Sequence, residues 1–144
     1  MRFKTLTGAT RSVSNIKKKL IKWNNKSRSK FQYRVKKFLE PYWDNHIVFE
    51  EFPIVGTRMS LDFYNANKKI AVEVQGGQHT KYVPHFHGGY KNNFIAQLNR
   101  DQKKLDFCRL NDITLVEIYE KDEINEKLFG KYGFWLVNIL YAGI

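Results

Sequence analysis

The sequence has little cysteine and proline and no long apolar run, and each shortage excludes a class of protein. Cys108 is the single cysteine among 144 residues, which excludes an intramolecular disulfide framework and a zinc site built on several cysteines. The three prolines are scattered, with no low-complexity tract or repeat. No apolar stretch reaches the ~18 residues of a membrane span, and no apolar signal segment follows the basic N-terminus. We expect a soluble, intracellular protein without a membrane partner.

Acidic residues are absent from the first quarter of the chain. Residues 1–39 contain 13 Lys and Arg and no Asp or Glu, whereas residues 40–144 contain 12 basic and 14 acidic residues. The net charge of +11 therefore arises from the N-terminal segment. Cations interleaved with Ser, Thr and Asn suit a nucleic acid backbone better than an acidic membrane or a merely solvated tail. The predicted contacts here are Arg11, Lys17, Lys18, Lys19, Lys22, Lys26, Arg28 and Lys30.

The spacing of apolar residues predicts one α/β (α+β) domain with a mixed sheet, spanning residues 29–144 after a basic arm at 1–28. Within the arm, Ile16, Leu20 and Trp23 suggest a short basic helix. The domain elements are predicted as a helix at 29–39 ending near Pro41, strands at 47–52, 59–64 and 69–75, a helix at 92–110, a strand at 113–119 and helical turns at 122–129. The helical and aromatic C-terminal segment, residues 132–144, either caps the core or forms a homodimer interface.

Three polar residues stand in two neighbouring predicted strands. Asp62 lies in the strand at 59–64, and Glu73 and Gln75 lie on one face of the strand at 69–75. The turn at 65–68 makes these strands antiparallel neighbours, which brings Asp62 beside Glu73. Two carboxylates suit Mg²⁺, which can polarise a phosphoryl oxygen and lower the pKa of an attacking water. The alternative is an edge hairpin with two solvated acids.

A loop with glycine pairs and three histidines follows these strands. The glycines permit close approach of a ligand, and His79 can act as a general base or bind a phosphate when protonated. His85 and His87 are predicted nucleic acid contacts. Zinc binding by the three histidines is the alternative, although the usual ligand spacing is missing.

The helix at 92–110 carries a second polar cluster. Gln97, Arg100, Asp101 and Lys104 share one helical face. An ordinary salt-bridged surface is the alternative. If this face covers the sheet, Arg100 and Lys104 would hold a scissile phosphate, and Asp101 would orient His79 or a metal-bound water.

Together these elements resemble the PD-(D/E)XK nuclease superfamily over residues 29–119, and most closely its very-short-patch-repair and phage homing endonuclease branch. The resemblance rests on Asp62, on Glu73-Val74-Gln75-Gly76-Gly77-Gln78-His79 and on Arg100-Asp101-Gln102-Lys103-Lys104. It implies a restriction-endonuclease-like αβββαβ core. It also implies Mg²⁺, with Mn²⁺ as a substitute, held by Asp62, Glu73 and the backbone carbonyl of Val74.

Two positions depart from the superfamily pattern. Gln75 occupies the motif's lysine position and cannot take up a proton, so His79 or Lys104 is the candidate base or electrophile. Gln32 stands near the place of a glutamate on the first helix in many relatives, with Glu40 and Glu51 as alternatives. One principal Mg²⁺ is therefore expected.

The function implied is a Mg²⁺-dependent DNA endonuclease that hydrolyses phosphodiester bonds, with DNA preferred to RNA. We expect association with a phage or mobile element, in the cytoplasm and near the nucleoid of a bacterial or phage-infected cell. A homodimer would suit cleavage of both strands. The alternatives are a catalytically weak or inactive nucleic-acid-binding module and a nuclease specific for junctions or mismatches.

Overall fold

A computed structural model describes residues 1–76 and 91–130 of the chain. The elements in chain order are β1 (Arg2–Lys4), β2 (Thr10–Ser12), a short 3₁₀ helix η1 (Ile16–Lys19), α1 (Lys30–Trp43), β3 (Val48–Pro53), β4 (Ser60–Asn65), β5 (Ile70–Gln75), α2 (Lys91–Leu110), β6 (Thr114–Tyr119) and α3 (Glu126–Gly130). The predicted elements of the domain are all found, with boundaries that differ by a few residues. The C-terminal segment at 132–144, predicted either to cap the core or to form a homodimer interface, lies outside the described residues.

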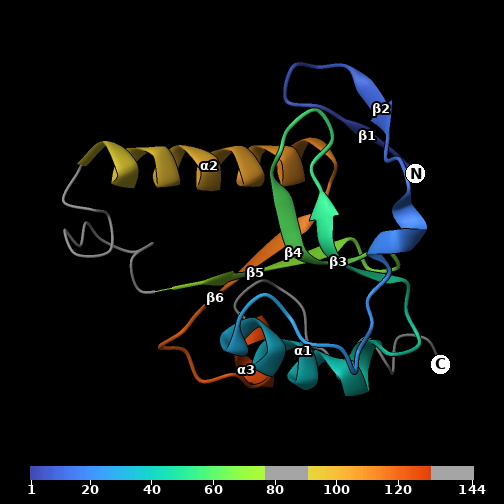
Figure 1. Ribbon diagram of the computed structural model, residues 1–144, viewed down its shortest axis with the longest axis vertical. Coiled ribbons are helices and arrows are strands. Elements are labelled where there is room, and N and C mark those ends of the chain that lie inside the picture. The colour runs from blue at the N-terminus through green and yellow to red at the C-terminus, as the bar shows by residue number, and fades with distance from the viewer. Residues whose placement is uncertain (77–90, 131–144) are drawn as a thin grey trace.

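Four strands form a mixed sheet in the order β3-β4-β5-β6. The first two pairings are antiparallel, because short turns join these strands, and β5 pairs with β6 in parallel. A parallel neighbour requires a crossover connection, and α2 lies within it. Helix α2 lies on one side of the sheet, and α1 and α3 lie on the other (Figure 1). The predicted α/β class with a mixed sheet is confirmed.

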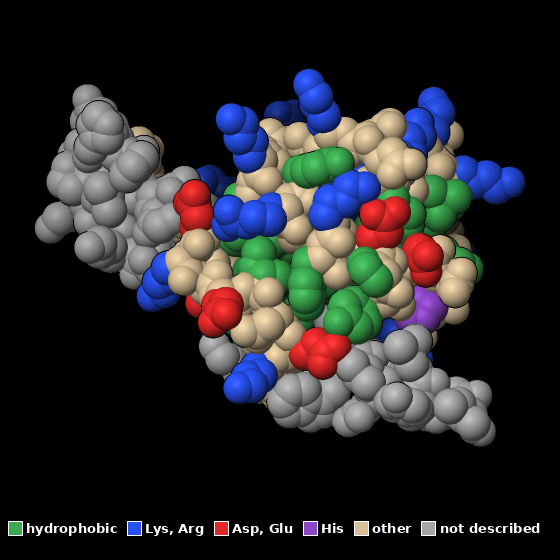
Figure 2. Space-filling view, turned by 90° about the horizontal axis from the view of Figure 1, so that it is seen from below, with side chains coloured by type: hydrophobic (Ala, Val, Ile, Leu, Met, Phe, Trp, Pro, Cys, Tyr) green, Lys and Arg blue, Asp and Glu red, His purple; other side chains and the backbone are tan. Residues whose placement is uncertain are grey.

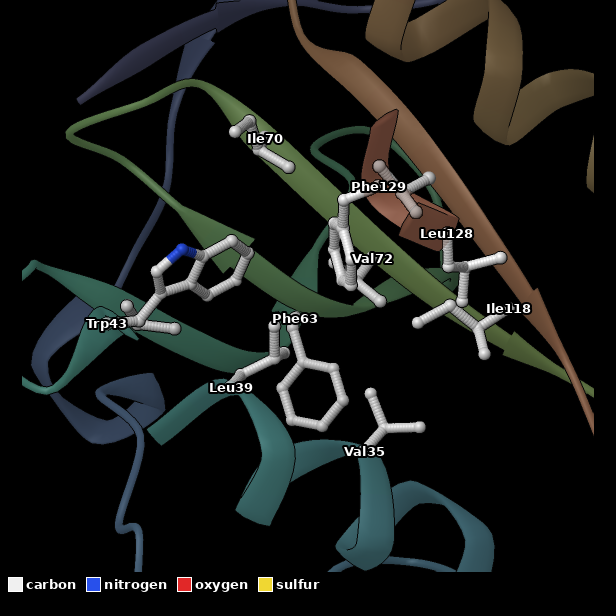
Figure 3. Close-up of a cluster of buried hydrophobic side chains, with 11 residues drawn as sticks. Val35, Leu39, Trp43, Phe63, Ile70, Val72, Ile118, Leu128 and Phe129 are labelled. Atoms are coloured by element: carbon white, nitrogen blue, oxygen red, sulfur yellow. The ribbon is translucent and has the colours of Figure 1, made fainter. Parts of the chain in front are cut away.

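The hydrophobic core has one cluster on each face of the sheet. On the α1 face, Val35, Leu39 and Trp43 pack towards strand residues such as Phe63 and Val72 (Figure 3). Leu128 and Phe129 of α3 close this cluster. On the α2 face the buried residues include Phe49, Phe52, Tyr64, Phe107 and Cys108. Helix α2 is thereby fixed over the sheet by its C-terminal half.

Helix α1 begins as predicted but extends beyond the predicted end. The Ser29 hydroxyl accepts a hydrogen bond from the Gln32 amide at 3.1 Å, which is an N-cap. The helix continues two residues past Pro41, to Trp43. A proline inside a helix removes one backbone hydrogen bond. Burial of Trp43, together with the hydrogen bond from the Tyr42 hydroxyl to Glu126 at 2.6 Å, favours the extra residues.

The structure contains an N-terminal hairpin that was not predicted from the sequence. Strands β1 and β2 pair antiparallel, and Phe3 is buried with its ring centroid 5.4 Å from that of Phe52 and 5.9 Å from that of Phe107. The Asn111 side chain bonds both the N–H and the C=O of Lys4, at 2.8 and 3.0 Å. Much of the basic segment predicted as an arm is therefore packed on the domain.

Phe3→Ala is expected to lower the free energy of unfolding by about 3 kcal/mol, because a buried aromatic ring leaves a cavity when truncated. Urea denaturation measures the change. Leu20→Ala, an exposed position in the same basic segment, is the matched control and should change stability by less than about 0.5 kcal/mol. An equally small effect of Phe3→Ala would show that the hairpin does not belong to the folding unit.

Candidate metal and catalytic site

Asp62 and Glu73 lie side by side at the centre of the sheet. Phe63 pairs with Val72 in the antiparallel register, so the next step along it places Asp62 opposite Glu73. The Asp62 amide donates to Glu73 Oε2 at 2.6 Å, and the Val74 amide donates to Asp62 Oδ2 at 2.9 Å. Asp62 is 8% exposed and Glu73 is 3% exposed. The expected proximity is therefore observed, and the alternative of two solvated acids on an edge hairpin is contradicted by their burial.

Lys104 reaches this pair from α2. Its ammonium forms an ion pair with Glu73 Oε1. Phe107 and Cys108 follow three and four residues later on the same helical face and are buried against the sheet, so this face also directs Lys104 to Glu73. Arg100, one turn earlier, is exposed. Of the two cations predicted to hold a phosphate, only Lys104 contacts the carboxyl pair.

Burial and mutual repulsion alter the protonation of the carboxyl pair. Burial, with the adjacent Asp62 charge, raises the pKa of Glu73 to about 8, although Lys104 opposes the shift. Burial also raises the pKa of Asp62, against the favourable hydrogen bond from Val74. At neutral pH the two carboxyl groups therefore retain a proton between them.

The neighbouring titratable groups are held in their protonated forms. Burial lowers the pKa of Lys104, but the charges of Glu73 and Asp62 and the hydrogen bond to Glu73 outweigh it, so its pKa is raised. Burial and the Glu73 charge raise the pKa of the Cys108 thiol to about 12. Lys104 is therefore suited to act as a cation rather than as a general base, and Cys108 is suited to packing rather than to nucleophilic chemistry.

Asp62 and Glu73 have the donor chemistry that a hydrated magnesium ion prefers. Within residues 1–76 and 91–130, no group of three or more acidic, histidine or cysteine side chains is arranged to hold a metal. Mg²⁺ commonly binds through one or two carboxylates and keeps several waters or substrate oxygens. Burial and mutual repulsion oppose full ionisation of both groups, and a bound divalent cation would displace the retained proton and neutralise both carboxylates. Asp62 and Glu73 therefore suit this ion, but they do not form a complete protein cage.

The other predicted site residues have varied positions. Gln75 is buried at the end of β5, beside Tyr119 of β6. Asp101 is partly buried, and its charge helps to raise the pKa of Lys104. His79, His85 and His87 lie outside the described residues, so their predicted roles stay predictions.

Three positions were considered for a further acidic residue of the site, and their surroundings differ. Gln32 is buried and donates to Glu50 and Glu51, both at 3.0 Å. Glu40 pairs with Lys37 of the same helix at 3.1 Å. Glu51 lies between Glu50 and Phe52, which pair with Phe63 and Leu61, so the β3–β4 register places it level with Asp62. The Glu51 charge contributes to raising the pKa of Asp62. Of the three, Glu51 is the residue whose charge acts on Asp62. It could have been identified from the sequence by counting residues back from the turn between β3 and β4.

Comparison with known proteins finds viral relatives. The chain is 38% identical over 74 residues to the uncharacterized protein 307L of Invertebrate iridescent virus 6, covering 51% of this chain and 37% of that protein. It is 38% identical over 66 residues to the uncharacterized protein 094L of Frog virus 3, covering 46% and 43%. The chain spans less than half the length of these relatives. No protein-family model and no solved structure matches it.

The nucleic acid contacts predicted in the basic N-terminal segment lie on the surface. Lys17, Lys18 and Lys19 belong to η1, and all the contacts predicted in residues 1–30 are exposed. Figure 2 shows Lys and Arg side chains projecting from one face, interleaved with acidic and hydrophobic ones. Five of the eight line a single groove: Lys18, Lys19, Lys22, Lys26 and Arg28. Among the described helices, none is long and apolar enough to cross a membrane.

Proposed function

We propose that this chain is a Mg²⁺-dependent DNA endonuclease that hydrolyses phosphodiester bonds. The observation that carries the proposal is the buried Asp62–Glu73 pair, with both pKa values raised and an ammonium group beside it. The element order α1, β3, β4, β5, α2, β6 is also the order of a restriction-endonuclease-like core, and supports that fold as part of the proposal. Viral relatives are compatible with a DNA-processing role in a virus or mobile element.

In the proposed reaction, Asp62 and Glu73 would hold Mg²⁺, with the Val74 carbonyl as a further ligand. The bound ion would supply polarisation of the phosphoryl oxygen and a water of lowered pKa. Lys104 stays protonated, holds the Glu73 carboxylate in position and presents positive charge where the phosphate becomes more negative in the transition state. Gln75 can orient a water through its amide but cannot accept its proton, so His79 stays the predicted acceptor of that proton.

The test is cleavage of supercoiled plasmid, branched DNA and single-stranded DNA with Mg²⁺, Mn²⁺ or EDTA. We expect nicked or linear products with either metal and none with EDTA. Absence of cleavage on every substrate with both metals would overturn the proposal. The same panel distinguishes a junction-specific nuclease, which would leave the plasmid intact and cut the branched DNA. A mismatched duplex added to the panel distinguishes a mismatch-specific nuclease in the same way.

Lys104→Met is expected to lower the cleavage rate by about 100-fold, because one preorganised charge at a transition state is worth this much or more. Lys103→Met is the matched control, since Lys103 is the exposed neighbour on the same helix. Rates are measured from the initial appearance of nicked plasmid. Similar rates for the two variants would remove Lys104 from the proposed machinery.

Gln75 in place of the motif lysine favours a second candidate, a nucleic-acid-binding module without catalysis. This module would bind DNA with strong salt dependence and equal affinity in Mg²⁺ and EDTA. Calorimetric Mg²⁺ binding that depends on Asp62 would count against it. The nuclease proposal also includes a cytoplasmic, nucleoid-associated location and a homodimer that cuts both DNA strands. The binding-module candidate includes neither.

A further inference from the structure

A groove of about 650 Å³ opens between the segment at residues 18–28 and the turn that joins β3 to β4. Cations dominate its lining: Lys18, Lys19, Lys22, Lys26, Arg28 and Arg58. Glu50 and Glu51 are its two acids. The lining also includes Asn25, Ser27 and Ser60, whose side chains can hydrogen-bond to a ligand.

Both acids of the groove are already neutralised by protein groups. Glu50 pairs with Lys36 at 2.8 Å and accepts hydrogen bonds from Ser27 at 2.6 Å and Gln32 at 3.0 Å. Glu51 pairs with Arg28 and accepts hydrogen bonds from Gln32 and Ser60. The four lining lysines and Arg58 are exposed and, within the described part of the chain, make no ion pair. The groove therefore offers positive charge to a ligand.

The wall of the groove is fixed by a buried lysine. Lys36 of α1 is 0% exposed, and its ammonium donates to the Asn25 carbonyl at 2.8 Å while pairing with Glu50. A buried ammonium requires such partners, and both partners belong to the groove. Lys36 of α1 thus links the basic segment to β3, so buried contacts fix the shape of the groove.

The groove lining includes Ser60, which lies two residues before Asp62 in β4. Glu51 also lies in the lining, and the β3–β4 register places it level with Asp62. Glu51 has φ of 56°, an uncommon backbone conformation for this residue within a strand, and contacts Arg28, Gln32 and Ser60 from there. Glu51 marks the boundary between the basic groove and the acidic site.

We propose that this groove binds the sugar-phosphate backbone of a nucleic acid without reading its bases and directs the strand towards Asp62 and Glu73. The path of the nucleic acid strand towards Asp62 and Glu73 rests on the proposed function, whereas the binding of the nucleic acid to the groove does not. Lysines interact with phosphates as point charges. Base recognition on single strands relies on aromatic stacking, and no aromatic residue is part of the described lining. The partner is therefore a polyphosphate chain of any sequence.

The experiment measures fluorescence anisotropy of two DNA duplexes of unrelated sequence, in EDTA and across a series of NaCl concentrations. We expect the two affinities to agree within about 2-fold, and log K to fall linearly with log salt concentration. The triple variant Lys18→Gln, Lys22→Gln, Lys26→Gln should reduce the magnitude of this slope by about 2.7, since each phosphate contact contributes about 0.9. The matched control is Lys103→Gln, Lys121→Gln, Lys127→Gln, which removes three exposed lysines outside the groove lining.

Three outcomes of the anisotropy experiment would overturn the groove proposal. These are an unchanged slope in the groove variant, an equal loss in the control variant, and a preference of more than about 10-fold between the duplexes. Binding of the wild type to anionic vesicles but not to DNA would do the same. The binding measurements are made in EDTA and need no cleavage, so a failure of the nuclease proposal would leave the groove result standing, and a failure of groove binding would appear without any cleavage assay.

Discussion

Asp62→Asn is expected to lower the rate of Mg²⁺-dependent plasmid cleavage by about 1,000-fold. A metal-bound site contributes several kcal/mol of charge stabilisation in the transition state, and each 1.36 kcal/mol is tenfold in rate. The substitution removes a charge while its amide oxygen can still accept the hydrogen bond from Val74. The fold should therefore survive, and the loss would report on the ion. Initial rates of nicking give the measurement.

Asp44→Asn is the matched control, because Asp44 is exposed at the C-terminal end of α1. Calorimetry should detect Mg²⁺ binding to the wild type and to this control but not to Asp62→Asn. Circular dichroism should give the same spectrum for all three proteins. Cleavage by Asp62→Asn at the rate of the control would exclude Asp62 from the reaction.

The parts of the site that sequence could predict are those fixed by local geometry. Asp62 and Glu73 come together because side chains alternate along strands and a short turn reverses the chain between them. Lys104 is placed by the helical repeat that buries Phe107 and Cys108. Helical spacing shows which side chains share a face, but tertiary packing decides that this face covers Glu73.

The parts that sequence could not predict depend on single long-range contacts. Phe3 is an isolated aromatic residue between two cations, so no apolar period indicates that the N-terminal hairpin packs on the sheet. The sequence pattern predicts Lys36 as a surface lysine of an amphipathic helix. Its burial is explained only by the positions of its partners, Asn25 and Glu50. Glu51 departs from regular strand geometry at its φ of 56°, which alternation does not reveal. The shape of the basic groove depends on Lys36 and Glu51. The charge pattern therefore predicted the cations that line the groove but not the groove itself.

Glu73→Gln is expected to stabilise the metal-free protein at alkaline pH while removing its response to Mg²⁺. Folded Glu73 has a pKa of about 8, whereas the ordinary value is 4.5. Between these values the folded state binds more protons than the unfolded state, so the free energy of unfolding of the wild type falls as pH rises from 4.5 to about 8. Glutamine does not titrate, so the variant lacks this part of the decline. Allowing for the lost ion pair with Lys104, the variant should be more stable by about 2 kcal/mol at about pH 9.

Urea denaturation in EDTA at about pH 5 and about pH 9 tests the expected difference. Glu120→Gln, an exposed glutamate just after β6, should follow the wild type at both values. Parallel pH dependence of Glu73→Gln and the wild type would contradict a raised pKa at Glu73. Added Mg²⁺ should stabilise the wild type but not Glu73→Gln, because only a protein that binds the ion gains free energy from it. A buried carboxylate that destabilises the metal-free fold, yet is needed for stabilisation by a cation, has the properties of a residue retained for function at the expense of stability.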